Sequence, residues 1–186
     1  GSEAARIDSS GRLMLGTTTE GDTAADNLTI ADSGASGITI RSGSSSTGNI
    51  YFSDATSGSG EYDGYIQYSQ NDRHLIFGTA TSERLRIDSS GRLLIGTTTA
   101  GDSAADDLTI ANSGHAGITI RSSSSSAAGI YFADGTSGSQ NYQGIIQYYH
   151  ATDELQFYTN YGASSDVRMR INSSGQILIG VASAST

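Results

Sequence analysis

The feature that most constrains this chain is an internal repeat of about 80 residues. The motif Arg-Ile-Asp-Ser-Ser-Gly-Arg-Leu occupies residues 6–13 and returns at residues 86–93. An altered copy, Arg-Ile-Asn-Ser-Ser-Gly-Gln-Ile, occupies residues 170–177. The second interval is slightly longer than the first, and its extra residues fall around residues 159–165, where we expect a loop.

These copies divide the 186 residues into a tandem array. We assign residues 1–2 to the remnant of an expression tag, residues 3–85 to a first repeat, residues 86–169 to a second, and residues 170–186 to the start of a third. Because the chain begins and ends on the same motif, we expect it to be a piece of a longer array.

The large apolar residues within a repeat come in pairs spaced by two, which places both members on one face of a β-strand. Gly, Asp, Asn and Ser between the pairs supply turns, and no segment keeps a helical period. The sequence therefore predicts an all-β chain with seven or eight short strands per repeat, all antiparallel or wound. In the first repeat the pairs are Leu13/Leu15, Leu28/Ile30, Ile38/Ile40, Ile50/Phe52, Ile66/Tyr68, Leu75/Phe77 and Leu85/Ile87.

The composition indicates that one chain cannot build a core alone. Leu, Ile, Val and Phe make up about 18% of the residues, below the roughly 20% at which highly charged chains are usually disordered. Burying a large side chain contributes about 1.5–3 kcal/mol, whereas ordering each residue costs about 1–2 kcal/mol of backbone entropy. We therefore expect three copies to share a core around a three-fold axis, in an elongated homotrimeric β-fibre.

The residues expected in the core of that trimer are taken from the apolar pairs of both repeats and of the start of the third. These residues are Ile38, Ile40, Ile50, Phe52, Ile66, Phe77, Ile118, Ile120, Ile130, Phe132, Ile146, Phe157, Ile177 and Ile179.

A series of short motifs recurs in the same order in both repeats. Ile-Tyr-Phe-x-Asp (residues 50–54 and 130–134) is followed by Gly-x-Ile-x-Tyr, Leu-x-Phe, Arg-x-Arg-Ile-Asp/Asn-Ser-Ser-Gly and Ile-Gly. In this order and spacing, over nearly the whole chain, they resemble the repeats of bacteriophage tail fibres and tailspike-related proteins. The resemblance implies a homotrimeric, β-rich fibre shaft in the extracellular part of a virion, often followed by a self-cleaving intramolecular chaperone.

Charge and composition also argue against several partners. The net charge is −9 and all ten basic residues are arginine, so a surface for nucleic-acid phosphates is not expected. No apolar run approaches the roughly 18 residues that cross a bilayer, so we expect no membrane insertion. Without cysteine the chain has no thiolate nucleophile or thiolate metal site.

Candidate catalytic groups are better explained as structural, so we expect neither an enzyme nor a cofactor. Cleavage of a surface glycan would need two carboxylates flanking one bond. The acidic residues shared by both repeats sit beside turn residues, where an aspartate usually bonds its own backbone. They are Asp8/Asp88, Asp22/Asp102, Asp26/Asp106 and Asp54/Asp134. None of His74, His115 and His150 has a histidine at the equivalent position of the other repeat, which argues against a catalytic triad.

Three weaker binding hypotheses stay open. His150 shares the parity of Ile146 and Tyr148, so three copies could place a metal ligand on the trimer axis. A calcium site could form from the acids of residues 102–107, namely Asp102, Asp106 and Asp107, or from Asp22 and Asp26.

The third binding hypothesis concerns tyrosine side chains. We expect Tyr62 and Tyr142 to pack over their turns. Tyr158 and Tyr161 lack counterparts in the first repeat. They would support an alternative function, an adhesive module that binds bacterial surface glycan or protein through loop tyrosines.

Overall fold

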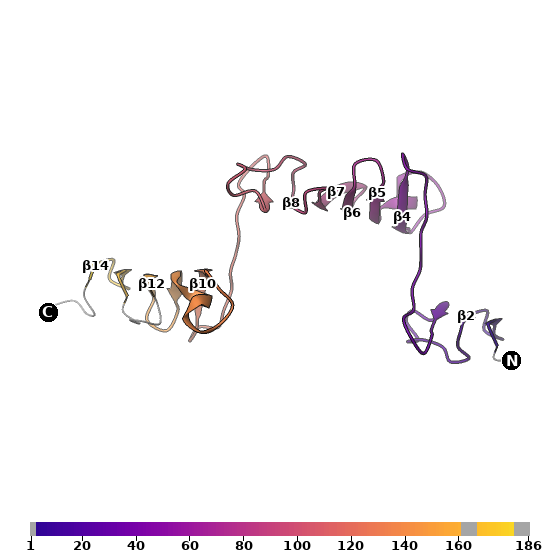
Figure 1. Cartoon of the computed structure of the whole chain (residues 1–186), viewed down its shortest axis with the longest axis horizontal. Coiled ribbons are helices and arrows are strands. Elements are labelled where there is room, and N and C mark those ends of the chain that lie inside the picture. Colours follow the sequence, from indigo (N-terminus) through magenta and orange to yellow (C-terminus); the bar gives the residue numbers. More distant parts are fainter. Residues whose placement is uncertain (1–2, 161–166, 181–186) are drawn as a thin grey trace. The chain divides into compact units, whose positions relative to one another are not determined.

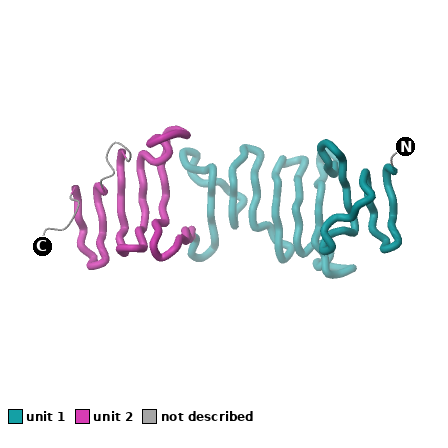
Figure 2. The backbone as a smooth tube through the Cα atoms, turned by 90° about the horizontal axis from the view of Figure 1, so that it is seen from below, with its two compact units in different colours: residues 1–116 teal, residues 117–186 magenta. Residues whose placement is uncertain are grey.

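The computed structural model describes residues 3–160 and 167–180. The chain is all-β, with 37% of it in strands and 6% helical, and it forms three sheets, none of them closed. It divides into two compact units: residues 1–116 hold the first two sheets and residues 117–186 hold the third (Figure 2). The all-β prediction is confirmed.

Within each sheet the strands neighbour one another in chain order (Figure 1). The first sheet contains β1 (Ala5–Ile7), β2 (Leu13–Leu15) and β3 (Leu28–Ile30). The second contains β4 (Thr47–Phe52), β5 (Gly64–Ser69), β6 (His74–Thr79), β7 (Ser82–Ile87), β8 (Leu93–Ile95) and β9 (Leu108–Ile110). The third contains β10 (Ala127–Phe132), β11 (Gly144–Tyr149), β12 (Glu154–Thr159), β13 (Met169–Ile171) and β14 (Ile177–Ile179).

The boundaries of the sheets do not coincide with the expected boundaries of the repeats. The boundary between residues 85 and 86 falls inside β7, so the second sheet draws strands from both expected repeats. Two short 3-10 turns, η1 (Gly58–Tyr62) and η2 (Gly138–Tyr142), follow β4 and β10.

Neighbouring strands pair antiparallel except in two places. Strand β3 pairs parallel to β2, and β9 pairs parallel to β8. Parallel neighbours need a long connection, because the chain must return to the end at which the previous strand began. Residues 16–27 and 96–107 provide those connections.

The strand expected at Ile38 and Ile40 is also not formed within one chain, and neither is its counterpart at Ile118 and Ile120. Residues 37–42 run as an extended trace between β3 and β4 (Figure 1). No hydrogen bond joins the backbone of residues 37–42 or 117–122 to any other residue in the described ranges.

The tight turns between β1 and β2 and between β7 and β8 are built by one aspartate each. Asp8 Oδ1 accepts hydrogen bonds from the backbone nitrogens of Ser10 at 2.8 Å and Arg12 at 3.0 Å. Gly11 closes the turn at φ +82°, a conformation that favours glycine. Asp88 repeats both bonds at 2.9 and 3.0 Å, which confirms the expected turn role of these acids.

Candidate functional site

The most distinctive surface of the chain is an apolar face on the six-stranded sheet. Strand register lines up two rows of large side chains across it. The first row is Ile50, Ile66, Phe77, Leu85, Ile95 and Ile110, and the second is Tyr68, Leu75, Ile87, Leu93 and Leu108. We call this surface, with its counterparts on the other two sheets, the apolar face.

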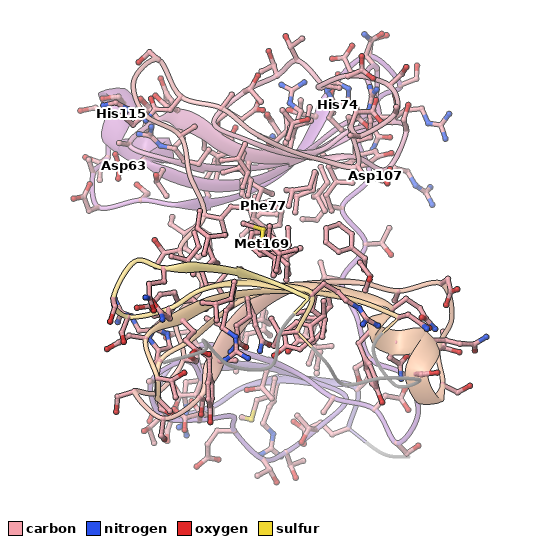
Figure 3. All side chains as sticks on the ribbon, turned by 90° about the vertical axis from the view of Figure 1, so that its left-hand side faces the viewer. Asp63, His74, Phe77, Asp107, His115 and Met169 are labelled. Atoms are coloured by element: carbon pink, nitrogen blue, oxygen red, sulfur yellow. The ribbon has the colours of Figure 1, made fainter. Side chains whose placement is uncertain are left out.

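The third sheet carries the same arrangement. Its rows are Ile130, Ile146, Phe157, Met169 and Ile179, beside Tyr148, Leu155, Ile171 and Ile177. On the first sheet Ile7, Leu13 and Leu28 form one row, and Leu15 and Ile30 belong to the other. Figure 3 shows Phe77 and Met169 projecting from their sheets, with His74 on the opposite side of β6 from Phe77.

Within a single chain this face is uncovered. Of the residues expected in a trimer core, only Ile66 and Phe157 are half-buried. The remainder expose between 37 and 71% of their surface. Those in β-strands lie on the apolar face, and Ile38, Ile40, Ile118 and Ile120 lie in the extended segments without backbone partners.

A hollow of about 240 Å³ interrupts the apolar face beside β4. Ile40 and Gly48 both line this hollow, and a Cβ on Gly48 would be 3.3 Å from Ile40 Cγ2. Ile50, Ile66 and Tyr68 complete its apolar wall.

The most buried apolar side chains lie on the opposite face of the sheets. Met14 and Leu94 are each 1% exposed, and Ile76, Ile145 and Leu178 are also buried. This second apolar layer was missed in the sequence. Its signal is a run of three apolar residues, as in Leu93-Leu94-Ile95, whose middle member must point away from the other two.

Arginine clamps flank that layer in equivalent positions of the first two sheets. Arg92 Nη1 donates to Asp106 Oδ2 at 2.7 Å, and Arg92 Nε donates to Asp88 Oδ2 at 2.8 Å. Arg12 holds Asp8 and Asp26 in the same way. Hydrogen bonding from Arg92 lowers the pKa of Asp88 to about 2. Each clamp ties a turn to the long connection that leads into the parallel strand.

The same clamps occupy acids that were candidates for calcium. Asp26 and Asp106 are bound by arginine, and Asp22 and Asp102 each accept a hydrogen bond from the backbone two residues on. Across residues 3–160 and 167–180 no group of three or more His, Cys, Asp or Glu side chains is placed to hold a metal ion.

The three histidines belong to different segments of the fold. His74 Nδ1 is 2.8 Å from Arg86 Nη1, on the face opposite the apolar one. His115 is exposed in the connection before residues 117–122. His150 packs edge-on against Tyr148, with ring centroids 5.0 Å apart, which agrees with its expected side of the sheet.

The structure places Tyr158, the first of the two possible ligand contacts, within β12. Its hydroxyl donates to Gln156 Oε1 at 2.6 Å, in the layer opposite the apolar face, and the ring is half-buried. Tyr161 lies outside the described residues. Tyr62 ends η1 and packs against Tyr51, with ring centroids 6.2 Å apart.

Fold and surface together define the class: an all-β protein whose open sheets each carry one uncovered apolar face. Neither a scan of known protein families nor a search of curated protein sequences finds a match to this chain. No helix in the described part of the chain has the length and apolar character to span a membrane.

Proposed function

We propose that this chain is a structural shaft segment of a trimeric bacteriophage tail fibre, which extends the fibre and presents a receptor-binding tip. The observation that carries the proposal is the uncovered apolar face, which recurs on all three sheets. Contiguous apolar patches of this kind mark surfaces that other protein covers. In this proposal the chain acts outside the cell, as part of a virion.

The best partner for the apolar face is another copy of the same chain. In every copy the equivalent sheet offers the same rows of large apolar residues, so equivalent faces can pack against one another in a symmetric oligomer. Three copies around one axis would bury the apolar faces inward and leave the acidic and hydroxyl side chains in water. The choice of three copies, and of a phage fibre, follows the resemblance of the repeat motifs to tail fibres.

The polar chemistry supports a scaffold over an enzyme. Asp8 and Asp88 close turns, while Asp26 and Asp106 are held by arginines, so these carboxylates have structural partners at each occurrence. In the alternative adhesive module, Tyr158 would make its contact from within β12. The proposal therefore needs no cofactor and no substrate.

Sedimentation equilibrium of the purified chain tests the proposal directly. We expect one species with three times the 19.2 kDa mass of a single chain, and rod-shaped particles in negative-stain electron microscopy. A folded monomer at micromolar concentration would overturn the proposal.

A further inference from the structure

The backbone groups of residues 37–42 and 117–122 lack hydrogen-bond partners in the described part of the single chain. Both segments read Gly-Ile-Thr-Ile-Arg-Ser, in which the two isoleucines alternate with polar residues and the Ile-Thr-Ile run is β-branched, as is typical of a strand. Neither forms a backbone hydrogen bond within the described ranges. At the end of each segment the hydroxyl of Ser42 or Ser122 is enclosed without a hydrogen-bond partner, which is unfavourable for a buried polar group.

The outer edges of β4 and β10 carry backbone groups that could pair with such segments. Both strands are the first of their sheets, so one side of each has no neighbouring strand. Gln70 N donates to Ser46 O at 3.0 Å, and in an antiparallel ladder this bond sets which residues face the neighbour. By that alternation the backbone groups of Thr47, Asn49 and Tyr51 point outward from β4.

The outer edge of β10 follows the same alternation. His150 N donates to Ser126 O at 3.1 Å, so Ala127, Gly129 and Tyr131 are the outward-facing residues. An uncovered strand edge of this kind is a template for an added strand.

We propose that residues 37–42 of one copy add as a strand to the outer edge of β4 in a second copy, and that residues 117–122 do the same at β10. The inference rests on the proposed homotrimer and assigns the contact that links its chains. The lengths agree, since each segment has six residues and β4 and β10 each have six. In the described part of the chain, each of the two segments directly precedes one of these two six-residue edge strands.

The segment's own β4 is not its partner. Residues 37–42 enter β4 through a tight turn in which Ser46 N donates to Gly43 O at 2.9 Å. On the N-terminal side of that turn, Ile40 lies across Gly48 on the apolar face. No backbone hydrogen bond links residues 37–42 to β4. Pairing with a second copy satisfies both sets of backbone groups and places Ile38 and Ile40 beside the apolar residues of β4.

Engineered cysteines test this pairing, because the natural sequence contains none. If the side chains of Ile38 and Ile40 join the apolar face, the side chain of Thr39 points to the opposite face. The side chains of Thr47, Asn49 and Tyr51 in β4 lie on that same opposite face. We would combine Thr39→Cys with Thr47→Cys, Asn49→Cys or Tyr51→Cys, one at a time, in the full chain. Ser59→Cys, in the exposed η1 turn, replaces the edge cysteine in the control.

We expect oxidation to give a covalent trimer on non-reducing gels with at least one edge cysteine and not with the control. A disulfide needs Cα atoms within about 7 Å, so such a product reports close pairing. In the unmodified trimer, hydrogen exchange at residues 37–42 should be as slow as in β4.

The outcomes separate this inference from the proposed function. A native trimer that gives only disulfides within one chain, or none, or whose residues 37–42 exchange at the rate of an open loop, overturns the pairing and leaves the trimer standing. A native monomer removes both.

Discussion

The ring of Tyr65 on β5 lies directly over Gly78 on β6, where any side chain at position 78 would collide with the ring. In the third sheet the equivalent pair is reversed, with Ile145 facing Tyr158. The aromatic ring has moved from one strand to its neighbour while the layer opposite the apolar face stays filled. This exchange explains why Tyr158 has no tyrosine counterpart in the sequence of the first repeat.

The exchange should be reproducible by mutation. Gly78→Tyr alone places two rings in one space, and we expect overpacking to lower the free energy of unfolding by about 1–3 kcal/mol. Adding Tyr65→Ile should recover most of that loss, because the double variant copies the pair at Ile145 and Tyr158. Urea unfolding of the single and double variants at one protein concentration measures the coupling, expected at about 0.5–3 kcal/mol. Additive effects would contradict the exchange.

A charge on the apolar face should prevent assembly. Phe77 lies in the middle of the first row, so Phe77→Asp would bring three carboxylates into the shared core of the proposed trimer. We expect the sedimenting mass to fall to that of one chain. Ser59→Asp adds the same charge in the exposed η1 turn and should leave the mass unchanged. An intact trimer of Phe77→Asp would show that β6 turns its other face to the axis.

Two neighbouring leucines separate the core of one chain from the contact between chains. Leu94 is 1% exposed in the single chain, so Leu94→Ala should cost about 2–5 kcal/mol at every protein concentration. Leu93 lies on the apolar face, so Leu93→Ala should act through assembly and lower the melting temperature most at low protein concentration. Melting curves over a hundredfold range of concentration make the comparison. Equal concentration dependence for both variants would argue against a shared core.

Acid should loosen the turn at Asp88. The folded chain holds the pKa of this carboxyl at about 2, against an ordinary 3.8, because Arg92 and two backbone nitrogens bond its ionised form. Its contribution to the free energy of unfolding is therefore complete above about pH 4 and is lost as the pH falls toward 2. Unfolding measured by circular dichroism over that range records the loss.

Asp88→Asn provides the control for that titration. The third copy of the turn already carries Asn172, whose Oδ1 accepts from the backbone of Ser174 and Gln176 at 3.1 and 2.9 Å. We expect the variant to keep the turn, to lose the ion pair with Arg92, and to depend less steeply on pH below 4. The same slope in both proteins would mean that other carboxyls govern the acid transition.

Much of the fold is readable from residue spacing. The pairs spaced by two predict most of the strands and place their members together on one face, as β4 to β9 show. Turn chemistry predicts the backbone bonds of Asp8 and Asp88, because a short acidic side chain reaches its own turn. Both signals act over a few residues, which is why a single sequence carries them.

Spacing leaves open those features that depend on residues far apart in the sequence. The parallel pairing of β8 and β9 depends on how residues 96–107 fold back, and the Arg92 clamp that fixes this connection joins residues 14 apart. Burial of Leu94 depends on what covers the second face, which spacing by two ignores. The segment at Ile38 and Ile40 has the right local pattern for a strand, but its backbone forms no hydrogen bond with any residue that the structure describes.

The turns at Asp8 and Asp88 draw nearly all their hydrogen bonds from within five residues of sequence. A repeat duplicated in the gene would therefore carry the residues that form its own turns, and it would need no new partner residues elsewhere. Selection could then change the length of such a protein by adding or removing repeats, while the hydrogen bonds within every turn stay the same.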